Sequence, residues 1–134
     1  MTLFGGPVAA PTPGSCPCGT GALYAVCCGP LHEGNQTART AEQLMRSRYA
    51  AFVVGDTAYL ARTWHPRTRP ADLEAANGVA WQGLTVLATA DGREDDSVGE
   101  VEFRAAHDGG VLHERSRFIR RAGRWVYVDG DVQT

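Results

Sequence analysis

The longest regular pattern of hydrophobic positions in the chain begins at Thr40 and has the 3.6-residue period of a helix. Thr40 and Gln43 have the spacing of an N-terminal capping box, and Gly55 is typical of a helix C-terminus. The pattern therefore predicts a main helix over residues 40–55, with one apolar face made of Ala41, Leu44, Met45, Tyr49, Phe52 and Val53.

Two shorter helical segments are predicted after this helix. Asp56 can cap a helix that runs to Thr63 and ends before Trp64-His65-Pro66. A third helical turn is predicted over residues 70–76, because a proline lies early in it and Asn77-Gly78 follows it.

Alternating apolar and polar residues replace the helical pattern from residue 81 onward. Four runs predict strands over residues 81–90, 98–107, 111–121 and 124–129. The turn residues between consecutive runs favour an antiparallel meander. Helices followed by strands predict an α+β fold, with about three helices packed on a curved four-stranded antiparallel sheet.

The charges of the central hairpin indicate its register. If Asp108-Gly109 is a two-residue turn, Glu102 lies opposite Arg115 and Glu100 lies opposite Arg117 on the outer face. The inner face then carries Val101, Phe103, Ala105, Leu112, Phe118, Trp125 and Tyr127, with two polar residues among them, Glu114 and Ser116. Polar groups on an inner face need hydrogen-bond partners.

Arg48 lies on the apolar stripe of the main helix, where an amphipathic helix would not favour a charge. Its head could reach solvent at the edge, but it could also point into a cavity together with Glu114. A structural ion pair between the two is favoured over catalysis, because no nucleophile or second carboxylate accompanies them. No catalytic residue is assigned, and the candidate pocket comprises Arg48, Tyr49, Trp64, His65, Arg69, Glu114 and Ser116.

All four cysteines lie within 13 residues, at Cys16, Cys18, Cys27 and Cys28. Four thiolates this close can surround one metal ion as a closed tetrahedral site, so we expect one Zn²⁺, or another thiophilic divalent metal, per chain. His32 and Glu33 follow the cysteines and are expected to be solvated, because four thiolates already complete the site.

Disulfides, an iron–sulfur cluster and a redox-active thiol pair are the alternatives to a metal site. A bond between the adjacent Cys27 and Cys28 would be strained. The C-x-C and C-C spacings match neither ferredoxin pattern, and a C-x-x-C redox motif is absent.

The composition is that of a globular domain with a small appendage: 134 residues, 43% hydrophobic and 21% charged. A net charge of −2 gives no electrostatic reason to expect nucleic acid or an anionic membrane as partner. Prolines interrupt the N-terminal segment, which lacks the basic residues of a signal peptide, so no membrane span and a cytoplasmic location are expected. The complete absence of lysine excludes Schiff-base and Walker-type chemistry.

The cysteine pattern, embedded in CPCGTG and YAVCCGP, resembles the SEC-C motif known from the tail of the SecA motor. The segments TAEQLMRSRYAAF, YLARTWHP, GLTVL and SRFIRRAGRWVYVDG, taken with this motif, resemble the YchJ-like family of small bacterial proteins. The resemblance implies a SEC-C zinc knuckle fused to a cone-shaped domain like that of nuclear transport factor two, which is also described as cystatin-like. It implies no established reaction.

The expected organisation is a flexible leader over residues 1–15, the zinc knuckle and its linker over 16–39, and the α+β domain over 40–134. An exposed sheet face would also allow a homodimer.

The leading functional hypothesis is a non-catalytic interaction or adaptor module whose knuckle docks on a protein partner. The SEC-C resemblance implies partners in the secretion, chaperone or translation machinery. Where the SecA tail is basic, this chain has Ala22-Leu23 and Ala25-Val26, which favours a hydrophobic protein surface as the partner. The alternative is a small-molecule-binding protein or enzyme that uses a pocket in the cone-shaped domain.

Overall fold

The computed structural model describes residues 14–75 and 78–133. Within them, a 3-10 helix and three short to medium α-helices precede four strands, which confirms the α+β fold. Most of the expected leader lies outside the described residues. The elements are η1 (Tyr24–Val26), α1 (Gly29–His32), α2 (Ala41–Val54), α3 (Thr57–Arg62), β1 (Trp81–Asp91), β2 (Val98–His107), β3 (Gly110–Arg121) and β4 (Arg124–Val132).

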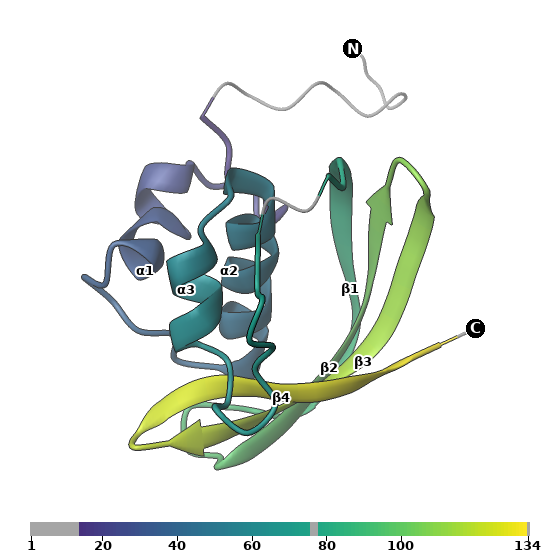
Figure 1. Cartoon of the computed structure of the whole chain (residues 1–134). Coiled ribbons are helices and arrows are strands. Elements are labelled where there is room, and N and C mark those ends of the chain that lie inside the picture. The colour runs from purple at the N-terminus through teal and green to yellow at the C-terminus, as the bar shows by residue number, and fades with distance from the viewer. Residues whose placement is uncertain (1–13, 76–77, 134) are drawn as a thin grey trace.

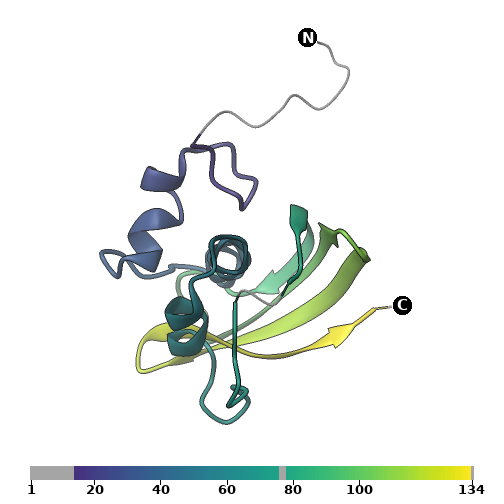
Figure 2. The same cartoon turned by 45° about the horizontal axis from the view of Figure 1, so that its top comes forward.

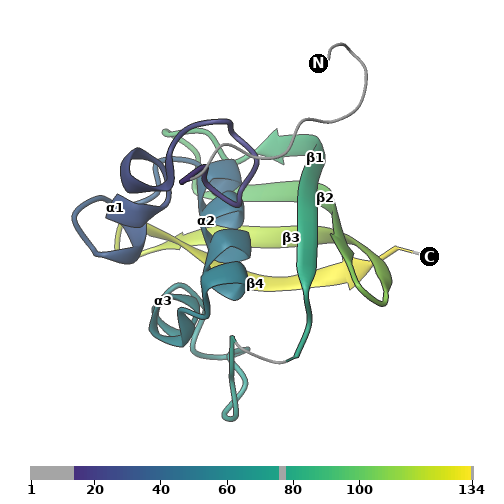
Figure 3. The same cartoon turned by 90° about the horizontal axis from the view of Figure 1, so that it is seen from above.

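The sheet is curved, and α2 lies across its concave side (Figure 1). Figure 2 shows this helix nearly end-on inside the curve of the sheet, and Figure 3 shows it from above, crossing the strands. The short helices α1 and α3 pack on α2. None of the described helices is long and apolar enough to cross a membrane.

The ends of α2 and α3 form as their sequences predict. The Thr40 hydroxyl accepts a hydrogen bond from the backbone N–H of Gln43 at 3.1 Å, and the Gln43 side chain accepts one from the N–H of Arg39 at 2.8 Å. Gly55 ends α2 with a φ of 81°, in the left-handed region that glycine adopts without strain. Asp56 caps α3 by accepting from the N–H of Tyr59.

The predicted third helical turn is wrong in the described part of its segment. Residues 70–75 form a turn and a bend without helical structure, and residues 76–77 lie outside the described residues. The N–H of Ala75 donates to the Thr57 hydroxyl, and the Ala75 side chain is buried against the helices. The segment is thus held by contacts with α3 and not by helical hydrogen bonds.

A helix forms instead where a linker was expected, at α1. Pro30 lies in the first turn of this helix, where its missing N–H has no effect, so it is compatible with the start of a helix. Leu31 of α1 is buried together with Ala51, Tyr59 and Leu60. This cluster attaches the N-terminal segment to the face of α2 that points away from the sheet.

The four strands form an antiparallel sheet in the order β1-β2-β3-β4, which confirms the predicted meander. The central hairpin has the predicted register, with Glu102 opposite Arg115 and Glu100 opposite Arg117. A shift of one residue near Phe118 in the β3–β4 pairing keeps the ring of Tyr127 on the inner face.

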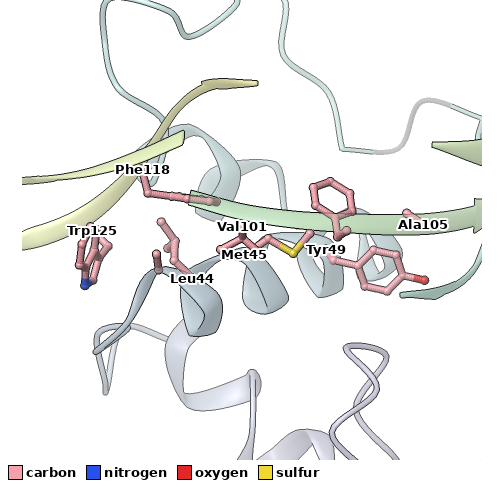
Figure 4. Close-up of a cluster of buried hydrophobic side chains, with 9 residues drawn as sticks. Leu44, Met45, Tyr49, Val101, Ala105, Phe118 and Trp125 are labelled. Atoms are coloured by element: carbon pink, nitrogen blue, oxygen red, sulfur yellow. The ribbon is translucent and has the colours of Figure 1, made fainter. Parts of the chain in front are cut away.

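The main core lies between α2 and the inner face of the sheet (Figure 4). Side chains from the helix meet side chains from β2, β3 and β4, so the core consists of Ala41, Leu44, Met45, Tyr49, Val101, Phe103, Ala105, Phe118 and Trp125. At the start of α2 the backbone of Gly92 approaches so closely that a Cβ there would lie 2.7 Å from the Cβ of Ala41. The apolar positions predicted from both periodicities therefore face one another, except Val53 at the end of α2, which is 40% exposed.

Candidate functional site

The four cysteines are brought together by a tight loop in the N-terminal segment. The N–H of Cys16 donates to the carbonyl of Ala22, which closes the loop, and Gly19 and Gly21 have φ values of 86° and 88° within it. The chain then passes through η1, and Cys27 and Cys28 follow. The Cys16/Cys18 pair and the Cys27/Cys28 pair are apart in the sequence, but the loop brings them next to each other in space.

The sulfur atoms fit a four-coordinate metal site. All four Sγ atoms lie within 4.8 Å of one another, and those of Cys18 and Cys27 are 3.6 Å apart. In a tetrahedral site with zinc–sulfur bonds of about 2.3 Å, neighbouring sulfurs are about 3.8 Å apart. The cysteines are free thiols and form no disulfide in the structure. Their arrangement could therefore hold one metal ion.

The charges of the cluster also favour a cation. A hydrogen bond from Cys28 holds the pKa of the Cys18 thiol near 4, whereas burial raises the pKa of Cys16 to about 11. The hydrogen bond to Cys18, together with burial, raises the pKa of Cys28 as well. Cys18 is thus charged at neutral pH while Cys16 and Cys28 keep their protons, and a divalent ion would supply the positive charge that further thiolates need.

The cysteine loop is anchored on α2 by polar contacts. Arg46 donates from Nη1 to the carbonyl of Cys18 at 2.7 Å. His32 bonds to the carbonyl of Ser47 through Nε2 at 2.8 Å and to the hydroxyl of Tyr24 through Nδ1 at 2.6 Å. Because a carbonyl only accepts, Nε2 carries a proton, and in the neutral ring Nδ1 then accepts from Tyr24.

The expectation that His32 is solvated is therefore wrong. Its side chain is buried, because α1 places it between Tyr24 and Tyr59, with ring centroids 5.6 and 4.6 Å away. Glu33 is exposed, as expected, and accepts from Asn35.

A cavity of about 230 Å³ lies between α2 and the inner face of the sheet. Five of the seven candidate pocket residues line it: Arg48, Tyr49, Trp64, Glu114 and Ser116. The remaining wall is mostly aromatic or aliphatic and consists of Met45, Phe52, Trp81, Phe103, Ala105, Leu112, Phe118 and Tyr127.

His65 and Arg69 do not line the cavity. The backbone N–H of His65 donates to the carbonyl of Tyr127, and its ring accepts from the N–H of Arg67. Arg69 is exposed and donates to the carbonyl of Ala61. Both residues stabilise the turn after α3, which directs Trp64 alone toward the cavity.

Arg48 is buried, with 6% of its surface exposed. Its Nη1 donates to the Leu60 carbonyl at 3.1 Å and to the Thr63 hydroxyl at 2.8 Å. Its guanidinium carbon lies 4.7 Å from the ring centroids of both Trp64 and Tyr127. Burial lowers its pKa to about 10, so it still carries its charge at neutral pH.

The expected contact between Arg48 and Glu114 is indirect. Glu114 accepts through Oε2 from the hydroxyls of Ser116, at 2.7 Å, and Tyr127, at 3.0 Å. Tyr127 therefore lies between the two charges, with its ring against the guanidinium and its hydroxyl on the carboxylate. Gly130 leaves the space that this carboxylate occupies, since a Cβ there would overlap Oε2. The two residues share one network without forming an ion pair.

Two indole groups at the cavity lack hydrogen-bond partners. The Nε1 atoms of Trp64 and Trp81 are buried, and neither has an acceptor among the described residues. A buried donor without an acceptor lowers stability by about 1–3 kcal/mol. Trp81 was not among the candidate residues, because it starts a strand whose first residues gave no indication of facing inward.

Comparison with known proteins agrees with this architecture. Residues 40–130 match the family model described as YchJ, middle NTF2-like domain. A UPF0225 protein of Streptomyces coelicolor is 59% identical over 121 residues, which cover 90% of this chain and 97% of that protein.

Two solved structures also resemble the chain. The solution structure of a SEC-C motif containing protein from Rhodopseudomonas palustris has a TM-score of 0.78 and 36% identity, covering 89% of this chain and 98% of the other. The crystal structure of a SEC-C motif containing protein from Psychrobacter arcticus has a TM-score of 0.66 and 33% identity, covering 89% and 82%. On the family match and these identities, the chain belongs to the YchJ-like UPF0225 family of bacterial proteins.

Proposed function

We propose that this protein binds a small molecule in the cavity between α2 and the sheet, and that a zinc ion on its four cysteines stabilises the N-terminal segment. The observation that carries the proposal is the state of Arg48: a buried, charged guanidinium with no carboxylate partner among the described residues. Folding alone disfavours such a group, and binding sites commonly retain groups of this kind.

Binding is favoured over catalysis by the residues that line the cavity. Glu114 is the one carboxylate among the described lining residues, which include no cysteine or histidine. General acid–base and nucleophilic mechanisms usually need a second such group within hydrogen-bond distance. Four thiolates would also close the metal site, so the zinc would have no open position for a substrate.

A thermal-shift screen against pools of metabolites tests the proposal. A ligand present at 100 times its dissociation constant should stabilise the folded protein by about 2.7 kcal/mol. The matched control is Ala105→Leu, which adds side-chain volume to the cavity wall and should abolish the shift without changing the metal content. A screen without hits, or hits that persist in Ala105→Leu, would contradict binding in this cavity.

Docking of the knuckle on a protein partner is the second candidate function. It is favoured by two exposed apolar side chains beside the cysteines, Leu23 at 51% and Val26 at 73% exposure. The secretion, chaperone and translation machinery, which the SEC-C likeness suggests, would supply the partner. Capture of one protein from host lysate should then be lost both with a chelator and in Leu23→Ser/Val26→Ser.

Two further features bear on where and how the protein acts. Four free thiols that bind metal require a reducing compartment, which supports the cytoplasm. A homodimer through the outer sheet face is less favoured than a monomer, because two arginines there, Arg115 and Arg117, are already paired. Arg115 contacts Glu100 and Glu102, and Arg117 contacts Asp129 and Asp131.

A further inference from the structure

The polar groups left without partners at the cavity are mainly donors. The hydrogen bonds of Arg48 to described residues both come from Nη1, which leaves Nε and Nη2 without an acceptor. The indole N–H groups of Trp64 and Trp81 are also unpaired, but their nitrogen atoms are buried and do not open onto the cavity, so the demand for acceptors comes from Arg48. A ligand that satisfies Arg48 must bring acceptor atoms, and at least two of these atoms must lie close together.

Because Arg48 is positively charged, the ligand group that accepts its hydrogen bonds is expected to be an anion. A planar guanidinium binds a carboxylate through two parallel hydrogen bonds, and this pairing is stronger than one with a neutral carbonyl. Trp64 and Tyr127 cover the guanidinium, which fixes its plane and shields it from water. A carboxylate arriving there would neutralise a charge that is already desolvated.

The rest of the cavity favours a ligand whose remaining part is apolar and small. Aromatic side chains form one wall, where the ring of Trp81 lies 6.0 Å from that of Tyr49 and 6.2 Å from that of Phe52. A volume of about 230 Å³ equals the space of about eight water molecules in the liquid. Such a space suits one small ring or a short alkyl chain.

We propose that the ligand of this cavity is a small monocarboxylate with an apolar body, whose carboxylate pairs with Arg48 and whose body lies against Tyr49, Phe52 and Trp81. This inference rests on the proposed function and specifies its ligand class. A cationic ligand fits less well, because the one carboxylate, Glu114, already accepts two hydrogen bonds through Oε2.

Three probes of nearly equal size separate the ligand classes: benzoate, benzamide and benzylamine. Isothermal titration calorimetry on the metal-loaded full chain should give benzoate a dissociation constant of about 1 mM or tighter, as expected for a fragment of this size. Benzamide should bind at least about tenfold more weakly, since it keeps the shape and loses the charge. Benzylamine should show no measurable binding.

Two variants test the assigned residues. Glu114→Gln keeps the side-chain shape and an oxygen that can accept from the hydroxyls of Ser116 and Tyr127, but it removes a negative charge near the ligand. The affinity for benzoate should therefore rise about threefold or more, while the affinity for benzamide stays the same. Arg48→Gln should weaken benzoate binding by at least about 30-fold. Arg67→Gln removes the same charge from an exposed position outside the cavity and should change nothing.

The outcomes separate this inference from the broader proposal. If benzamide binds as tightly as benzoate and Glu114→Gln has no effect, the cavity binds small molecules but not carboxylates as a class. If none of the probes binds while the metabolite screen gives hits that Ala105→Leu abolishes, the monocarboxylate inference is wrong and the binding function stands. Because Glu114→Gln is isosteric, it keeps the test decisive even if Arg48→Gln fails to fold.

Discussion

Replacing Cys18 with alanine should strip the protein of its metal, which we expect to be one zinc ion per chain bound by Cys16, Cys18, Cys27 and Cys28. Cys18 is fully buried, so no outside group can take its place as a ligand. A structural zinc site contributes on the order of 10 kcal/mol to the segment that binds it. Elemental analysis of the purified variant measures the loss directly.

The control for this variant is Thr20→Val. The Thr20 hydroxyl lies 3.2 Å from the Cys27 sulfur but is not one of the four sulfur ligands, so this change should leave the metal in place. Protein that contains no transition metal and carries two disulfides by mass spectrometry would refute the zinc site.

The structural effect of metal loss should be confined to the cysteine loop. The apolar cluster of residues 16–28 is made of the cysteines themselves, with Tyr24 and Ala50 of α2. Leu31 of α1 is instead held by Ala51, Tyr59 and Leu60 in the helical cluster. Hydrogen exchange after chelation should therefore rise over residues 16–28 and remain low in α2 and the strands. A global loss of protection would show that the domain depends on the metal.

The features that could be predicted from the sequence depend on short-range physics. The ends of α2 and α3 are determined by side chains within three residues of the cap, at Thr40 and Asp56. The register of the central hairpin follows from a two-residue turn and two pairs of opposite charges. The cysteine cluster was predictable because four soft ligands lie within 13 residues.

The predictions that were wrong concern features that depend on contacts with distant parts of the chain. The segment 70–75 has helix-like ends but gives its Ala75 N–H to the hydroxyl of Thr57, a contact that local patterns cannot reveal. His32 is buried because α1 folds back onto Ser47 and Tyr59. In both cases a contact with a residue distant in the sequence determines the structure.

The cavity shows the same limit within a single site. Periodicity correctly places Arg48 and Glu114 on facing surfaces, because each pattern defines a face. It does not define how far along the helix or strand a side chain lies, so the ring of Tyr127 between them could not be foreseen. That the indole N–H groups of Trp64 and Trp81 are unpaired can be recognised only from the three-dimensional positions of all the acceptors around them.

Replacing Phe118 with alanine should lower the free energy of unfolding by about 3–5 kcal/mol, the loss typical of removing a buried phenylalanine. Phe118 is 1% exposed, lies in the core beneath α2 and contacts the ring of Tyr127 edge-on at a centroid distance of 5.8 Å. It also lines the cavity, so the void left by the ring would join a space that already exists and could not close by a small shift.

Urea unfolding of the metal-loaded protein measures this loss, and Val111→Ala is the matched control. Val111 lies on the same strand but is 60% exposed, so its truncation should change the free energy of unfolding by less than about 0.5 kcal/mol. A loss below about 1 kcal/mol for Phe118→Ala would mean that this ring does not hold α2 on the sheet. The full loss, with the metal content unchanged, would show that the core supports the cavity independently of the cysteine site.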